Sequence, residues 1–594
     1  MFYTAPLDDM RFLLRDVWPI ATHLAPLACF EHVSADITEA VLQEAGRVAE
    51  QVLFPLLQTG DAQGCQFNAG QVSTPEGFKS AYRALAEGGW VVPTARPEHG
   101  GQQLPHALSL LIDELFWSAN NALFLTPNLT HGVYRCLSTH ASEQLKQDYL
   151  PKMVSGEWTG VMCLTEPHCG TDLGLLNTKA EPVAGQEGSY HISGTKIFIT
   201  SGEHDLTENI VHVVLARLPD APAGVKGISL FLVPKYLTND AGELTTRNAV
   251  SCGSIEHKMG LNASSTCVMN YDAAVGYLVG EPHRGLQAMF TVMNAERVSI
   301  GLQGLGLAEL AYQNAAQYAK ERLQGRAPTG AIYPDKPADP LLVHPDIRRL
   351  LLNIRSFVEG GRALTIWMGQ HLDNLEHHPQ KKLCERSGQL VNLFTPVIKA
   401  FFTDEAFRLS NDALQVLGGH GYVKEWGLEQ IVRDARIAQL YEGANGIQGL
   451  DLVRRKLIAD KGEAVGIFLA EVDQFLAELP ENLDCQLDQL VKPLQEAVMR
   501  LRRSSDWIIQ AAVDNPAEAG AAATPYLTLF GLTAMAYMWL RVAVVASQSE
   551  AGYARDKLVL ARYFILKRLP ESLGLEQVIL AGSETLMAPS LDFF

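Results

Sequence analysis

The sequence has no pair of cysteines spaced as CxxC and no cluster of side chains at metal-ligand spacing. Its nine cysteines are an odd number, which indicates reduced thiols and favours a cytoplasmic protein over a secreted one. The 17 histidines are scattered along the chain, so we predict no metal site. The N-terminus lacks a basic stretch followed by an apolar run, and a secretory signal is therefore not indicated.

The chain also lacks an excess of positive charge. Its net charge of −18 argues against nucleic acid as a partner, because phosphate backbones are normally bound by a basic face. No GxGxxG motif opens a βαβ unit, so a Rossmann nicotinamide site is not supported. The most apolar segment, 526–546, is near the roughly 20 residues that cross a bilayer. It contains Gly531 and is interrupted by Arg541, so we expect a buried helix and at most peripheral membrane contact.

What the chain does have is length for several domains: 594 residues, 47% of them hydrophobic. Helical periodicity predicts an N-terminal helical domain over 1–158, including a short extension. Short β-branched runs separated by Gly, Asn and Pro predict a central antiparallel β domain over 159–281. Helical patterns return in a bundle over 282–460 and in an additional domain over 461–594, where the Ala/Pro-rich stretch 515–525 is expected to be a connector. The predicted class is α+β, in the order helix, sheet, helix.

One segment carries most of the chemical information: residues 441–448 read Tyr-Glu-Gly-Ala-Asn-Gly-Ile-Gln. The carboxylate of Glu442 lies between an aromatic residue and a pliable turn. A glutamate beside Tyr441 and Leu440 can lose water, so its pKa should rise towards that of a useful base. Taken alone, a helix cap or a solvated carboxylate is the commoner explanation of such a residue.

Three further motifs precede this segment. Residues 162–172 read Met-Cys-Leu-Thr-Glu-Pro-His-Cys-Gly-Thr-Asp, 194–202 read Gly-Thr-Lys-Ile-Phe-Ile-Thr-Ser-Gly, and 417–422 read Leu-Gly-Gly-His-Gly-Tyr. In this order the four segments resemble the motifs of the acyl-CoA dehydrogenase family, and the resemblance covers roughly 40–460. The long terminal extensions look most like the large bacterial branch that includes methylthiopropionyl-CoA and long-chain acyl-CoA dehydrogenases.

The resemblance implies an FAD-dependent α,β-dehydrogenation of an acyl-CoA thioester to trans-2-enoyl-CoA, a step of fatty-acid β-oxidation. Glu442 would remove the α-proton, flavin N5 would accept the β-hydride, and an electron-transfer flavoprotein would receive the electrons. Two alternatives remain at this point: an acyl-CoA oxidase that uses dioxygen, and a flavin-bearing, nucleic-acid-binding protein of the alkylation-response type. The acidic chain disfavours the second.

A second carboxylate complicates the assignment of the base. Glu296 falls where isovaleryl-type members of the family carry theirs. Glu442 is preferred because its whole surrounding motif is present, and Glu296 is expected to pair with Arg297 or to face solvent. For Arg297 itself, a helix-surface ion pair is the alternative to a place near the substrate.

The resemblance also assigns binding residues. Those expected at the FAD of the same subunit are Met162, Leu164, Thr165, Gly170, Thr171, Phe198 and Thr200. Those expected at the FAD of a neighbouring subunit, which implies a homodimer, are Arg322, Gln415, Gly418 and Gly419. Those expected at the substrate are Thr171, Asn294, Arg297, Tyr441 and Gly443. The chain departs from the family pattern in three places: Phe198 replaces Trp, Ala444 replaces Thr, and the Phe of the Gln-Phe-Gly that normally follows Arg322 is missing.

Overall fold

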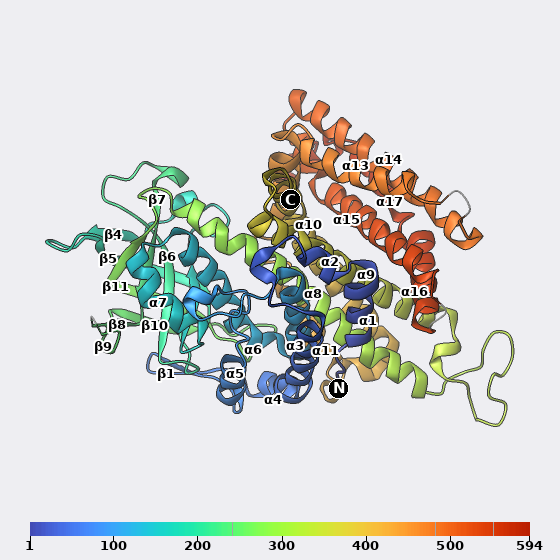
Figure 1. The fold of residues 1–594 in the computed structure, drawn as a ribbon, viewed down its shortest axis with the longest axis horizontal. Coiled ribbons are helices and arrows are strands. Elements are labelled where there is room, and N and C mark those ends of the chain that lie inside the picture. The colour runs from blue at the N-terminus through green and yellow to red at the C-terminus, as the bar shows by residue number, and fades with distance from the viewer. Residues whose placement is uncertain (240, 481–482, 550–551) are drawn as a thin grey trace. The chain divides into compact units, whose positions relative to one another are not determined.

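A computed structural model describes residues 1–239, 241–480, 483–549 and 552–594 of the chain. The predicted class is confirmed: helices dominate both ends of the chain, and the strands of the β domain come between them in the sequence (Figure 1). The residues form two compact units. The first comprises Met1–Gly46, Pro105–Ser118 and Arg297–Phe594, and the second comprises Arg47–Leu104 and Ala119–Glu296.

The secondary structure elements are as follows. The helices are α1 (Leu7–Phe12), α2 (Ile20–Leu24), α3 (Ala35–Val48), α4 (Leu57–Gln63), α5 (Phe78–Glu87), α6 (His106–His140), α7 (Glu143–Val154), α8 (Gly285–Glu321), α9 (Pro345–His377), α10 (Lys381–Leu417), α11 (Leu428–Ile437), α12 (Asn445–Asp451), α13 (Glu463–Ala477), α14 (Cys485–Asp514), α15 (Ala517–Ala546), α16 (Gly552–Tyr563), α17 (Glu571–Leu580) and α18 (Glu584–Met587). The strands are β1 (Gln66–Asn68), β2 (Gln71–Ser73), β3 (Trp158–Cys163), β4 (Lys179–Pro182), β5 (Ser189–Thr200), β6 (Asn209–Arg217), β7 (Ile228–Pro234), β8 (Tyr236–Thr238), β9 (Leu244–Arg247), β10 (Val250–Ile255) and β11 (Thr266–Val279).

The second unit is built on a seven-stranded sheet. Its strand order is β10-β11-β5-β4-β6-β3, and β7 pairs with both β11 and β6. Most pairings are antiparallel, as expected, but β3 runs parallel to β6 over six residue pairs from Trp158 to Cys163. Both β6 and β7 are buried almost throughout, which is why they read as continuous apolar runs. The core of the sheet includes Val161, Ile192, Ile210, Val214 and Phe231.

The first unit contains long helices that pack along one another. Helices α9 and α10 form an antiparallel pair, and α15 packs against both of them as well as against α12, α14 and α17 (Figure 1). The prediction that 515–525 form a connector is wrong from Ala517 onwards. Helix α15 begins at Ala517 and contains Pro525. The alanine-rich stretch favours a helix strongly enough to outweigh the one backbone hydrogen bond that the proline removes.

Among the described residues, only α15 combines the length and the apolar composition of a membrane-spanning helix. It is long and apolar enough to cross a membrane, yet 83% of its most apolar window is buried inside the protein. Close packing explains the composition: a Cβ added at Gly531 would lie 2.4 Å from the Phe401 ring, and one at Gly449 in α12 would lie 3.0 Å from the carbonyl oxygen of Ala523. These contacts support the expectation of a buried core helix.

A buried network of ion pairs joins distant segments within the first unit. Arg362 on α9 is 1% exposed, and its guanidinium donates to Glu114 at 2.9 and 3.1 Å and to Glu309 at 2.9 Å. It also pairs with Asp9, which in turn pairs with Lys557 on α16. Arg362 thus ties the N-terminal segment to α6, α8 and α9, and Lys557 ties it to α16.

Replacing Arg362 with Met should lower the free energy of unfolding by about 3–5 kcal/mol, because it leaves buried carboxylates without their partner. Arg349→Met on the same helix is the matched control. Arg349 pairs with Asp346 at the surface, so its loss should cost about 0–1 kcal/mol. Equal shifts of the urea midpoint in the two variants would contradict this account.

Candidate active site

The predicted catalytic glutamate lies in a short turn of the first unit, between α11 and α12. The turn is closed by backbone bonds from the Tyr441 N–H to Ile437 O at 3.2 Å and from the Asn445 N–H to Gln439 O at 3.0 Å. Glu442 has φ +55° and Gly443 has φ +87°. A left-handed backbone is uncommon for a glutamate, and such strain persists only where surrounding contacts hold it.

The environment of Glu442 alters its acidity. Its side chain is half-buried, and burial raises the pKa of Glu442 to about 7, although the positive charges of Arg297 and Lys399 oppose the rise. The predicted increase in pKa is therefore found. A carboxyl group with this pKa is divided between its acid and base forms near neutral pH, as a general base requires.

Side chains from α8, α10 and α12 hold this turn from beneath. Lys399 on α10 donates to the carbonyl oxygen of Gly443 at 2.8 Å and to Oδ1 of Asn445 at 2.7 Å. Gln448 Nε2 donates to the carbonyl oxygen of Glu442 at 3.1 Å. The Tyr441 hydroxyl donates to Gln303 on α8. Sequence reasoning missed Lys399, Gln448 and Gln303, because helix periodicity places them in the core without indicating what they contact.

Arg297 is buried, at 8% exposure, so the alternative of a helix-surface ion pair is wrong. Its charge interacts with Asp451 and Glu442, and a Cβ added at Gly443 would lie 3.8 Å from its Nη2. The residue therefore lies beside the Glu442 turn within the first unit, where it provides positive charge.

Glu296 belongs to the second unit and does not face solvent, contrary to one expectation. It is 2% exposed, and its Oε2 accepts a hydrogen bond of 2.5 Å from Asn128 Nδ2 on α6. A Cβ added at Gly132 would lie 2.4 Å from its Oε1. Glu296 therefore fills a closely packed position between α6 and α8 of that unit.

A buried ion pair joins the motifs 162–172 and 194–202 of the second unit, which are both expected at the flavin. Lys196 on β5 is 0% exposed and donates to Glu166 Oε1 at 2.8 Å and to Leu164 O at 3.0 Å. Glu166 also accepts from the backbone amides of Asn177 and Thr178. These bonds close the loop between residues 166 and 178, whose outer part carries the exposed Gly170 and Thr171.

Phe198 lies at a β-bulge of β5. Lys196 pairs with Met269 and Ile199 with Cys267, so Ile197 and Phe198 together oppose a single residue. Phe198 has φ +58° and is 60% exposed. A bulky residue in the left-handed region is a genuine outlier, and here it presents an aromatic face to the outside of the sheet.

The remaining residues assigned to the cofactor in this unit lie along the same two segments. Met162 is buried at the end of β3, and Leu164, Thr165 and Thr200 are half-buried. An exposed aromatic ring accompanied by accessible hydroxyl groups fits a flat, polar-edged ring such as the isoalloxazine of FAD. Asn294, assigned to the substrate, is exposed on α8 of the same unit.

Arg322, Gln415, Gly418 and Gly419 are exposed on the first unit. Gly418 has φ +60°, and Cβ atoms added at Gly418 or Gly419 would meet nothing within 4 Å, so a ligand could approach the backbone closely. Tyr318, one turn before Arg322, bonds His420 at 2.8 Å, and His420 stacks on Trp426 at 4.8 Å. Sequence reasoning missed these aromatic rings. They lie near Arg322, after which the chain lacks the Phe of the family pattern.

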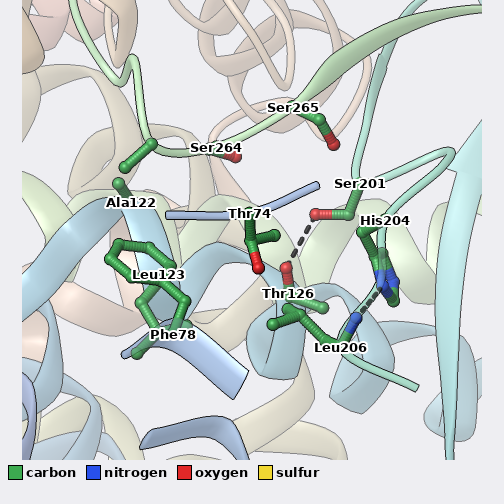
Figure 2. A pocket seen from close by; sticks show the side chains of 11 residues that line it. Thr74, Phe78, Ala122, Leu123, Thr126, Ser201, His204, Leu206, Ser264 and Ser265 are labelled. Carbon is green, nitrogen blue, oxygen red and sulfur yellow. Dashed lines mark hydrogen bonds between the residues drawn. The ribbon is translucent and has the colours of Figure 1, made fainter. Parts of the chain in front are cut away.

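Figure 2 shows a small cavity of the second unit that is unsuited to a substrate. Thr126 and Ser201 point toward each other across it and share a hydrogen bond of 2.7 Å. Its volume of about 10 Å³ leaves room for about one water molecule. Burial lowers the pKa of the neighbouring His204 to about 3, so this histidine is neutral and serves packing.

The helix–sheet–helix fold, a glutamate with a raised pKa and an exposed aromatic ring at a β-bulge are each consistent with a flavin-dependent acyl-thioester oxidoreductase. Four family descriptions match the chain: "Acyl-CoA dehydrogenase, N-terminal domain" at 36–157, "middle domain" at 161–274, "C-terminal domain" at 283–457, and "Acetyl-CoA dehydrogenase C-terminal like" at 468–590. The chain belongs to the acyl-CoA dehydrogenase family. It is an FAD-dependent acyl-CoA dehydrogenase, as its motifs predicted.

Several relatives match nearly the whole chain. A 3-methylmercaptopropionyl-CoA dehydrogenase of Ruegeria pomeroyi is 38% identical over 100% of both chains. The broad-specificity linear acyl-CoA dehydrogenase FadE5 of Mycobacterium tuberculosis is 32% identical over 93% of both.

Solved structures share the fold. Caenorhabditis elegans ACDH-11 in complex with C11-CoA aligns with a TM-score of 0.78 and 17% identity, over 99% of this chain and 96% of that one. An acyl-CoA dehydrogenase from Bacillus anthracis complexed with FAD aligns with a TM-score of 0.74 and 20% identity, over 93% and 89%.

Replacing Phe198 with Gly should leave the FAD-free protein at least as stable as the wild type. The glycine relieves a left-handed strain of about 1 kcal/mol, and the exposed ring contributes little packing. FAD should bind at least about tenfold more weakly, because an aromatic contact is worth about 0.5–1.5 kcal/mol beyond its buried area. Urea unfolding and flavin titration measure the two effects.

Phe198→Val is the matched control, since a β-branched residue tolerates this backbone poorly. It should unfold at a lower urea concentration than either Phe198→Gly or the wild type. A lower midpoint for the glycine variant than for the valine variant would show that the bulge is not strained.

Proposed function

We propose that Glu442 is the base that removes the α-proton of an acyl-CoA thioester, so that the product is the trans-2-enoyl-CoA. The observation that carries the proposal is a half-buried carboxyl group, held in a left-handed turn, whose pKa is raised to about 7. Strongly perturbed carboxyl groups in strained turns are found preferentially at catalytic sites.

The reaction divides between this chain and its cofactor. A thioester α-carbon is a weak acid, so the base must be ionised near neutral pH and fixed in position. We infer that the backbone N–H of Glu442 donates to the thioester oxygen and stabilises the charge that develops there as the proton leaves. FAD, when bound, accepts the hydride from the β-carbon. Arg297 and Lys399 supply positive charge that keeps the glutamate able to ionise.

We infer that the enzyme works as a cytoplasmic homodimer and passes its electrons to an electron-transfer flavoprotein. All nine cysteines are free thiols, which supports a reducing compartment. The exposed Arg322 can form a bidentate contact with phosphate, and the bare backbone at Gly418 and Gly419 permits close approach. These features support a role at the FAD of the neighbouring subunit.

For the substrate, we propose a short acyl group that carries a thioether, with short linear acyl groups as the next candidates. The support is the relative that matches the chain end to end, which is named for 3-methylmercaptopropionyl-CoA. An anaerobic panel of acyl-CoA thioesters that includes this compound and butyryl-CoA ranks the candidates by the rate of flavin bleaching.

Glu442→Gln should slow flavin reduction by the best thioester about 10²–10⁴-fold, because the amide cannot accept the α-proton. FAD binding should be unchanged, since the replacement is isosteric. Stopped-flow absorbance under anaerobic conditions measures the rate.

Glu296→Gln is the matched control, since it replaces the other candidate carboxylate and keeps an oxygen to accept from Asn128. Its flavin reduction should stay within a few-fold of the wild-type rate. If Glu296→Gln were inactive and Glu442→Gln reduced its flavin normally, the base would have been assigned to the wrong residue.

The rate of flavin reduction should depend on pH through Glu442. Below about pH 7 the carboxyl group is protonated and cannot act as a base, so kcat/KM should fall by about tenfold per pH unit as the pH drops. Above this pH, kcat/KM should reach a plateau that lasts until another group titrates. A pH profile that is flat between 5.5 and about 8 would exclude a base with this pKa.

A further inference from the structure

A lysine lies beneath the catalytic turn, completely removed from solvent. Lys399 on α10 is 0% exposed, and its ammonium donates hydrogen bonds to the carbonyl oxygen of Gly443 at 2.8 Å and to Oδ1 of Asn445 at 2.7 Å. Both acceptors are uncharged. Burying an ammonium group costs several kcal/mol unless nearby negative charge offsets it, so this lysine needs an explanation beyond packing.

The bonds of Lys399 act on the backbone of the turn. Gly443 follows the left-handed Glu442 directly, and its carbonyl group is fixed from below by the ammonium. Asn445, the second acceptor, is itself held: its Nδ2 donates to Asp404 at 2.7 Å and to Thr403 at 2.9 Å. The turn is thus bonded to three positions on α10, Lys399, Thr403 and Asp404, and the strained backbone has a rigid support.

The same ammonium also acts on the carboxyl group. Its charge lowers the pKa of Glu442, and Glu442 in return raises the pKa of Lys399, which burial brings down to about 7. The two groups therefore favour each other's charged forms. Two further charged residues interact with this pair: Arg297 on α8 and Asp404 on α10. Arg297 in turn interacts with Asp451 on α12 and with Arg455 in the segment that follows α12.

We propose that Lys399 is a positioning residue for the dehydrogenation: it fixes the Glu442 turn in its left-handed conformation and places a buried positive charge beneath the base. The inference rests on the proposed role of Glu442. It adds a second requirement for the reaction, because a glutamate at the same place without this lysine would be held less firmly and would ionise less readily.

The first test is the pH profile of flavin reduction in the FAD-loaded variant Lys399→Met. Removing the positive charge disfavours the carboxylate, so the pH of half-maximal rate should move upward by about one unit or more. Lys399→Gln, which keeps a donor but no charge, should show the same upward shift with a smaller loss of maximal rate. An unchanged or lowered midpoint in both variants would reduce Lys399 to a structural residue and overturn the proposal.

Lys557→Met is the matched control: it removes another buried lysine of the same unit, one that pairs with Asp9 and Glu359. This variant should be less stable towards urea, yet its pH midpoint should equal that of the wild type. If Lys557→Met moved the midpoint as far as Lys399→Met, the shift would reflect general destabilisation and the proposal would fail.

The second test needs neither FAD nor substrate. Hydrogen exchange of backbone amides in 439–448 should be at least about tenfold faster in FAD-free Lys399→Met than in the wild type, because the turn loses its support. Lys557→Met should leave exchange in this segment unchanged. Unaltered exchange in the Lys399 variant would refute the positioning role, as would failure of both Lys399 variants to fold. If Glu442→Gln reduced its flavin normally, the proposed function would fail while the exchange result still stood.

Discussion

The proposed chemistry depends on one constraint: the carboxyl group of Glu442 has to lose water and still be able to ionise. Burial alone would keep Glu442 protonated. Two buried cations, Arg297 and Lys399, oppose that effect, and the balance leaves a pKa of about 7. The lysine also fixes the Gly443 carbonyl, so one side chain contributes both to the acidity of the base and to its position.

The second unit follows the same physical rule. The ammonium of Lys196 is offset by Glu166, which four hydrogen-bond donors surround. Burial raises the pKa of Glu166, but these donors outweigh it and hold the pKa below the usual range. In each unit a buried lysine on a regular element supports a loop or turn with functional residues. Backbone strain at Phe198 and Glu442 is kept because rigid neighbours hold it.

Much of the fold could be predicted from the sequence because its signals are local. β-Branched runs marked the strands β5, β6, β7 and β11, and helical periodicity marked the long helices. Errors occurred where tertiary packing overrode local composition: the alanine-rich start of α15 around Pro525 was expected to be a connector, and β3 pairs in parallel with a strand far along the chain. Two options left open by the sequence, solvent exposure for Glu296 and a helix-surface ion pair for Arg297, are wrong because both side chains are buried in the folded protein.

The sequence by itself determined the class of chemistry, because the four motifs at 162–172, 194–202, 417–422 and 441–448 and their order along the chain can be read from residue types alone. Only the tertiary structure decided which lysines are buried and what they contact. Lys399 lies 43 positions before Glu442 in the chain, and helical periodicity does not indicate that the two residues meet. Its charge acts strongly on Glu442 because water is excluded around it, and water is excluded by helices that meet only in the folded protein.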